Sequence, residues 1–304
     1  MHTNKNYIRL TQIILVFVFL VILAGGIVRT TQSGMGCPDW PRCFGMLIPP
    51  TSASQLPPDY EKYLSKQDID HTFNAFHTWT EYINRLCTAV LGLLVIIHVV
   101  WSFKNFFKAK PIVFWLSFIF LIIIGVEAWL GKVVVDTNLA VVKITAHMLL
   151  ALVLAAVPVI ILYRLTNQLK VFDKTLKAFV TISLVVLLAQ IIIGTDVREQ
   201  IDKISASFDY AQRNIWISRL DNFFLLHKII SGIVCFFCVL IFWKSLSNQS
   251  LQKRGVFILV VVFCIMALGF TMAYFQIPSF AQPLHLLFSS VLFISLFALR
   301  LRLK

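Results

Sequence analysis

The chain is short of charge, and above all of negative charge. Only 13% of its 304 residues are charged and just 14 are Asp or Glu, whereas about 25% of the residues of a soluble domain are charged. Hydrophobic residues make up 59% of the chain, and the mean hydropathy is +0.83. This composition excludes an ordinary soluble domain and predicts an integral membrane protein.

Eight apolar runs of about 18 to 25 residues are each long enough to cross a hydrocarbon core of roughly 30 Å. They lie near 10–28, 79–103, 111–131, 141–163, 177–194, 222–243, 255–275 and 283–302. The first run follows Lys5 and Arg9, as a signal peptide would, but it is longer than the usual apolar core of about 7–15 residues. We therefore predict an all-α integral membrane protein with eight transmembrane helices.

Acidic residues are nearly absent from one side of the predicted membrane. The side that holds both termini carries 15 Lys or Arg and a single acid, Asp173. Cytoplasmic loops are enriched in Lys and Arg, so both termini are predicted to be cytoplasmic. The formal charge of +13 then reflects orientation and contact with anionic lipid, and we expect no nucleic-acid partner.

The two halves of the chain look like a repeat. The stretch that begins at Asn84 aligns with the one at His227, and the stretch around His147 aligns with the one around His285. Four helices in each half is an even number, so the expected architecture is two parallel-repeat four-helix bundles, 1–170 and 171–304. Long outer loops near 29–78 and 195–221 are expected to carry function.

Histidine is scarce, and three of the seven histidines share one depth in the predicted helices. These are His147, His227 and His285, with Asn84 in the fourth equivalent place. Neutral imidazole is a standard axial ligand of haem iron, so this pattern favours a membrane haem protein. Zinc is disfavoured because it needs three or four ligands that converge on one point. We interpret His98, near the cytoplasmic end of its helix, as an interfacial residue.

Two acids lie within the predicted helices. Glu81 shares a helix face with His77 and Asn84, one turn outward of Asn84. Beside a cofactor such a carboxylate transfers protons or stabilises a cation; the alternative is an ion pair with Arg85. Glu127 is expected on a proton path or in a hydrogen bond to a cofactor substituent.

Basic residues and cysteines complete the candidate site. Four cations near the outer helix ends suit haem carboxylates, or simply reach the membrane interface: Arg29, Arg85, Arg198 and Lys228. Cys37 and Cys43 lie close together in the first outer loop, where thiols outside a bacterial membrane tend to oxidise. Cys235 and Cys238 form a CxxC within an apolar helix, which we interpret as small apolar residues.

Several segments together resemble the haem A synthases, the CtaA/Cox15 family. The segments are Gly25–Pro41, Glu81-Tyr82-Ile83-Asn84-Arg85, Gly194-Thr195-Asp196-Val197-Arg198-Glu199, Phe224-Leu225-Leu226-His227-Lys228 and Gln282-Pro283-Leu284-His285. They are distributed over the whole chain. The resemblance implies a multi-pass enzyme of the bacterial inner membrane that oxidises the C8 methyl of haem O to a formyl group through a hydroxylated intermediate. The product, haem A, serves cytochrome oxidase assembly.

The resemblance also assigns roles to residues. It implies a haem b cofactor bound by His227 and His285, and a substrate haem O in the N-terminal half, where Glu81 and His147 match catalytic positions. It implies a disulfide between Cys37 and Cys43. The family has His where this chain has Asn84, so His147 holds the substrate haem alone or another group substitutes.

The implied partners are haem O synthase, which is a farnesyltransferase, cytochrome oxidase assembly factors, an electron donor or acceptor, and a second copy of the chain. Three other classes remain as alternatives. A membrane di-haem b electron-transfer protein would prefer two histidines at both sites. A transporter would favour broken helices at the midplane. A thiol–disulfide oxidoreductase would more usually carry a CxxC in its outer loop.

Overall fold

The computed structural model describes residues 5–64, 72–137, 141–166 and 168–304. Eight helices in these ranges are long and apolar enough to cross a membrane. They are α1 (Lys5–Thr30), α3 (Ala75–Phe106), α4 (Pro111–Asp136), α5 (Val141–Leu165), α6 (Lys174–Ser207), α8 (Asn222–Ser245), α9 (Gln249–Tyr274) and α10 (Ala281–Arg300). The predicted all-α membrane protein with eight spanning helices is confirmed.

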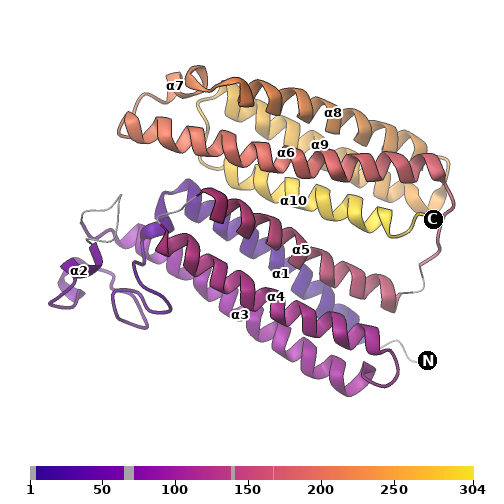
Figure 1. The fold of residues 1–304 in the computed structure, drawn as a ribbon, viewed down its shortest axis with the longest axis horizontal. Coiled ribbons are helices and arrows are strands. Elements are labelled where there is room, and N and C mark those ends of the chain that lie inside the picture. Colours follow the sequence, from indigo (N-terminus) through magenta and orange to yellow (C-terminus); the bar gives the residue numbers. More distant parts are fainter. Residues whose placement is uncertain (1–4, 65–71, 138–140, 167) are drawn as a thin grey trace. The chain divides into compact units, whose positions relative to one another are not determined.

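The chain forms two compact units, Met1–Ile161 and Leu162–Lys304 (Figure 1). In the first unit, α3 packs against both α1 and α4. In the second unit, α6 and α9 each pack against both α8 and α10. Helices α8 and α10 therefore lie on opposite sides of this four-helix bundle, each flanked by the same two neighbours. The parallel relation between the halves and the cytoplasmic termini stay predictions.

Local sequence determines where several of the long helices begin. A side-chain oxygen accepts a hydrogen bond from a first-turn backbone N–H at Asn74 before α3, Asp173 before α6, Asp221 before α8 and Asn248 before α9. Pro111 opens α4, where its missing N–H is not needed. Such caps satisfy backbone donors that a helix start leaves unpaired. They fix the register of α8, whose His227 lies within two turns of its cap.

The second outer loop is shorter than predicted. Helix α6 was expected to end near residue 194, but it continues to Ser207. Ion pairs one turn apart support this polar extension, with Arg198 to Asp202 at 2.9 Å and Lys203 to Glu199 at 2.7 Å. Its Ile201 is buried against Trp216. The prediction was wrong because it ended the helix where the apolar run ends.

Short helices occupy the connections. The first outer loop contains η1 (Ser33–Met35), η2 (Ala53–Gln55) and α2 (Glu61–Leu64), and the second contains α7 (Arg213–Trp216) and η3 (Ile217–Arg219). In α7, the Arg213 guanidinium lies 5.5 Å from the centre of the Trp216 ring. The loops are thus ordered by their own packing in the parts that the structure describes.

His98 is not an interfacial residue, as the sequence suggested. It is fully buried, at 0% exposure. Its Nδ1 lies 3.3 Å from Tyr7 Oη, and its Nε2 lies 3.0 Å from Thr11 Oγ1. Tyr7 Oη also lies 2.9 Å from Ser117 Oγ. Because α1 supplies partners to both ring nitrogens, the imidazole can be buried without the cost of an unpaired polar group.

Candidate functional site

His147 lies on α5 and contacts two residues of α4. Its Nδ1 pairs with Oε2 of Glu127, a side chain that is only 5% exposed. A Cβ added at Gly131 would lie 3.9 Å from His147 Cε1. Gly131 therefore leaves room for the ring edge while Glu127 engages one ring nitrogen, which leaves Nε2 as the atom for a metal.

His285 lies on α10 in the same relation to α9. Its Nδ1 lies 3.2 Å from the main-chain oxygen of Ile265, so this nitrogen donates to a carbonyl. A Cβ added at Gly269 would lie 3.5 Å from His285 Cε1. Here too a glycine accommodates the ring edge, one turn after the residue that binds Nδ1.

His227 lies on α8 and faces α6. A Cβ added at Gly194 would lie 3.1 Å from His227 Cε1, a separation that real Cβ atoms rarely show. Gln190 Nε2 donates to the main-chain oxygen of His227 at 2.9 Å. Among the described residues, buried Nδ1 of His227 has no hydrogen-bond partner.

The three histidines therefore share one environment, which we call the glycine seat. Each seat consists of a glycine on the adjoining helix and the residue four positions before it: Glu127 and Gly131, Gln190 and Gly194, Ile265 and Gly269. These two residues lie on one face of their helix. Sequence reasoning missed the glycines, although Gly131 and Gly269 precede their histidines by the same number of residues.

Asn84 lies on α3, as predicted, and its side chain is partly buried. Its Oδ1 is buried and has no hydrogen-bond partner within the described ranges. Its main-chain oxygen accepts from Thr88 Oγ1 at 3.0 Å. An amide is a poor iron ligand, but a buried and unpaired amide oxygen can accept a hydrogen bond from water.

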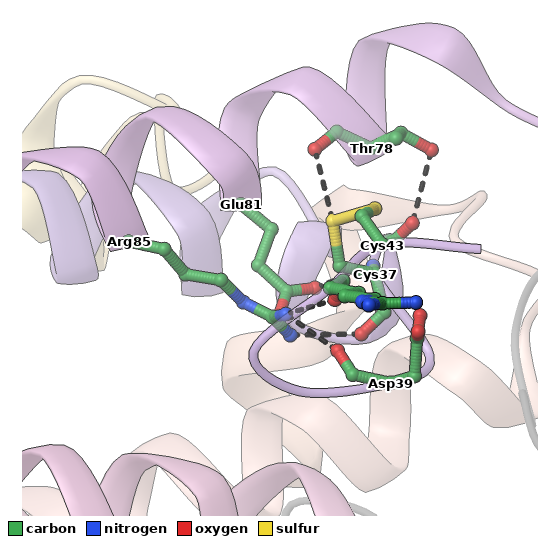
Figure 2. A network of polar contacts seen from close by, with 8 residues as sticks. Cys37, Asp39, Cys43, Thr78, Glu81 and Arg85 are labelled. Atoms are coloured by element: carbon green, nitrogen blue, oxygen red, sulfur yellow. Dashed lines mark hydrogen bonds and ion pairs between the residues drawn. A yellow bond between two sulfur atoms is a disulfide. The ribbon is translucent and has the colours of Figure 1, made fainter. Parts of the chain in front are cut away.

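Glu81 is clamped between its own helix and the first outer loop (Figure 2). Its Oε2 accepts from the Cys37 backbone N–H at 2.7 Å, and its Oε1 pairs with Arg85. The residue is 4% exposed. The ion pair considered as the alternative role for Glu81 is therefore formed, together with a loop contact that the sequence did not predict.

Arg85 binds the loop that carries the two cysteines. Its guanidinium donates to three main-chain oxygens, at 2.8 Å to Cys37, 2.6 Å to Asp39 and 3.0 Å to Arg42. Cys37 and Cys43 are both buried and form a disulfide. A planar guanidinium can donate several hydrogen bonds at once, so Arg85 holds this loop against α3 (Figure 2).

Gly36 lies against the first turn of α3. A Cβ added there would lie 2.4 Å from the main-chain carbon and oxygen of His77. Thr78 Oγ1 donates to the Gly36 oxygen at 2.9 Å. The loop and the helix therefore meet backbone to backbone, and this contact brings Cys37 within reach of Glu81.

The other predicted basic residues are placed as follows. Arg29 is partly buried near the end of α1. Arg198 pairs with Asp202, and the exposed Lys228 lies 4.7 Å from the centre of the Phe224 ring. In α8, Cys235 and Cys238 are free thiols. Arg29 and Lys228 lie near an end of α1 and α8, as the sequence predicted, whereas Arg198 lies within α6, because that helix continues to Ser207.

Eight spanning helices, with histidines that lie against glycines of neighbouring helices in both units, define an integral membrane protein with imidazole sites between its helices. The chain belongs to the COX15-CtaA family of cytochrome oxidase assembly proteins, whose model matches residues 8–297. The family resemblance found in the sequence is confirmed. Because its relatives are bacterial, the chain is a multi-pass protein of the bacterial inner membrane.

Individual relatives are similar over part of their length. A heme A synthase of Shewanella oneidensis is 30% identical over 190 residues, which cover 61% of this chain and 54% of that protein. A heme A synthase of Exiguobacterium sibiricum is 36% identical over 108 residues, 34% of this chain and 29% of the relative. A heme A synthase of Shouchella clausii is 32% identical over 129 residues, which cover 42% of this chain and 35% of that protein. The chain thus spans about half or less of each of these relatives.

Proposed function

We propose that this protein is a haem A synthase, which oxidises the C8 methyl of haem O to a formyl group through a hydroxylated intermediate. The haem A so formed supplies cytochrome oxidase assembly. One observation carries the proposal: three imidazoles, one in the first unit and two in the second, each lie in a glycine seat. Membership of the COX15-CtaA family adds independent support.

The second unit is proposed to bind haem b through His227 and His285. Their helices, α8 and α10, lie on opposite sides of the bundle, so the two histidines would hold the group between them. Gly194 and Gly269 keep side chains away from the two ring edges. The residues present therefore fit the group, whose contribution when bound is one-electron transfer.

The first unit is proposed to bind the substrate, haem O, through His147. Asn84 stands where the family has histidine, so His147 would be the one strong protein ligand of the substrate iron. The unpaired Oδ1 of Asn84 is suited to hold a water molecule there. Arg29 and Arg85 in this unit, and Arg198 and Lys228 in the second, are proposed to pair with haem propionates.

Glu81 is proposed to accept protons from the substrate methyl group. Conversion of a methyl to a formyl group with an oxygen from water releases protons and electrons in pairs, and a carboxylate is a suitable proton acceptor. The Cys37 N–H and Arg85 hold this carboxyl group, so the disulfide loop positions it. An external electron acceptor is required. Haem O synthase would deliver the substrate, and oxidase assembly factors would receive the product.

The test is the haem content of the purified protein, with and without co-expression of a haem O synthase. We expect haem b alone without that partner, and hydroxylated haem O or haem A in addition with it. Glu81→Gln should keep haem b and lose haem A. Glu199→Gln, which removes the acid that pairs with the exposed Lys203 on α6, should leave both unchanged.

A second candidate is an electron-transfer protein with haem b in both units. The pairing of both Glu81 oxygens favours it, since a clamped carboxyl group is what a purely structural role requires. Haem b alone under both expression conditions, with no oxidised haem O, would establish this candidate and remove the synthase.

A further inference from the structure

The glycine seats of His147 and His285 differ in one respect. In α4, Glu127 precedes Gly131 by four residues, and in α9, Ile265 precedes Gly269 by four residues. Both glycines face Cε1 of their histidine. At His285 the acceptor for Nδ1 is the main-chain oxygen of Ile265, at 3.2 Å. At His147, Nδ1 instead forms an ion pair with a side-chain oxygen, Oε2 of Glu127.

Glu127 is well placed to act on His147. It is 5% exposed, and both of its carboxyl oxygens are buried. In the part of the chain that the structure describes, Oε2 contacts His147 as an ion pair. Lys132, on the same helix, is engaged elsewhere, since its Nζ lies 2.5 Å from Asp136 Oδ2. The Glu127 carboxyl group is thus directed at the imidazole rather than at a neighbouring cation.

We propose that Glu127 is a positioning residue for His147, which holds its Nε2 toward the iron of the substrate haem and strengthens it as a ligand. The inference rests on the proposed function of the first unit. It also accounts for Asn84. Where the family has a second histidine this chain has Asn84, so the substrate haem would depend on a single strong ligand, His147.

The physical reason lies in the second hydrogen bond of a ligating imidazole. An Nδ1–H that donates to a carboxyl oxygen fixes the tautomer and the ring orientation, and it raises the basicity of the nitrogen that binds the metal. A carboxylate accepts more strongly than a main-chain carbonyl. The stronger donor stabilises ferric over ferrous iron, so Glu127 should lower the reduction potential of the haem in the first unit.

The test uses the full-length protein loaded with haem, and the variants Glu127→Gln, Glu127→Asp and Glu127→Ile. The last gives α4 the residue that α9 has at the equivalent position. The readouts are the iron–histidine stretching band of the ferrous protein in resonance Raman spectra and the midpoint potential of each haem. A haem with two histidine ligands gives no such band, so the band reports on the first unit alone.

We expect the iron–histidine band to fall in frequency and the midpoint potential of the haem in the first unit to rise. Both changes should be smallest for Glu127→Asp, larger for Glu127→Gln and largest for Glu127→Ile. The affinity of the first unit for haem should fall about 10- to 100-fold for Glu127→Ile. The potential of the other haem serves as an internal reference and should not move. Glu199→Gln should change neither haem.

An unchanged band and an unchanged potential in Glu127→Gln and Glu127→Ile, with haem still bound, would overturn the inference. This result is distinguishable from failure of the proposed function. If the proposed function is wrong, the unsubstituted protein itself will yield no oxidised haem O when haem O synthase is co-expressed. If Glu127→Ile does not fold, the band frequency and the midpoint potential of Glu127→Gln alone test the inference.

Discussion

At the scale of single residues, glycine determines how closely the site can be assembled. Gly36 lets the cysteine loop meet the α3 backbone, and Gly194 lets an imidazole lie against α6. In both cases a methyl group would occupy space that a neighbour already fills. Glycine in a helix otherwise costs about 1 kcal/mol relative to alanine, so its presence in α6 needs a compensating reason.

Gly36→Ala should destabilise the first unit. Its Cβ would lie 2.4 Å from His77 and 2.7 Å from the Thr78 nitrogen, and backbone atoms cannot move aside as a flexible side chain does. We expect a loss of about 1–3 kcal/mol, as for other overpacked sites, measured by thermal unfolding in detergent. Gly92→Ala, where nothing lies within 4 Å, is the control and should not lower stability.

Gly194→Ala should weaken haem binding in the second unit. The added methyl group would lie 3.1 Å from His227 Cε1 and tilt the ring away from its ligating position. We expect the haem b content to fall, measured by absorbance of the purified protein, while α6 remains helical. Gly232→Ala on α8, with open space around it, should retain haem. Equal haem b content in Gly194→Ala and Gly232→Ala would show that the glycine seat of His227 does not contribute to haem binding.

At the scale of secondary structure, α6 shows how polar residues extend a membrane helix. The residues beyond the apolar run form pairs one turn apart, with Arg198 to Asp202 and Glu199 to Lys203. Helical ion pairs of this i,i+4 kind contribute only about 0.3–0.5 kcal/mol each. The burial of Ile201 with Trp216 and Ile277 stabilises the extension more, since a buried Ile side chain contributes about 1.5–3 kcal/mol.

Hydrogen exchange should show this extension as protected helix. We expect slow exchange at backbone amides up to Ser207, and Ile201→Pro should abolish it from residue 198 onward, because proline removes a hydrogen bond and clashes with the preceding turn. Lys203→Ala, which removes the exposed cation of one pair, should leave the protection nearly unchanged. Fast exchange throughout 195–207 in the unsubstituted protein would contradict the structure of this segment.

At the scale of the whole molecule, the distribution of charge makes a topological prediction. With basic residues concentrated on one side, both termini should face the cytoplasm. A fluorescent protein fused after Lys304 should therefore fluoresce in cells. Alkaline phosphatase inserted after Gln212, in the second outer loop, should be active. The opposite pair of results would reverse the orientation and place the cysteine loop on the reducing side.

The sequence by itself determined the eight helices, because the length of an apolar run and the cap that precedes it are local properties. Asp221 and Asn248 begin α8 and α9 without help from distant residues. The position of His227, six residues after Asp221, follows from the first of these boundaries. The end of α6 could not be found in this way, because it depends on packing against Trp216.

Only the tertiary structure decided which groups surround each candidate residue. Glu81 binds Cys37, 44 residues earlier in the chain, and His98 binds Tyr7, 91 residues earlier. His147 pairs with Glu127 on a different helix. Periodicity shows which face of a helix a residue occupies, but not which face of another helix lies opposite. That depends on how the helices pack, and it is this packing that supplies Glu127 to His147.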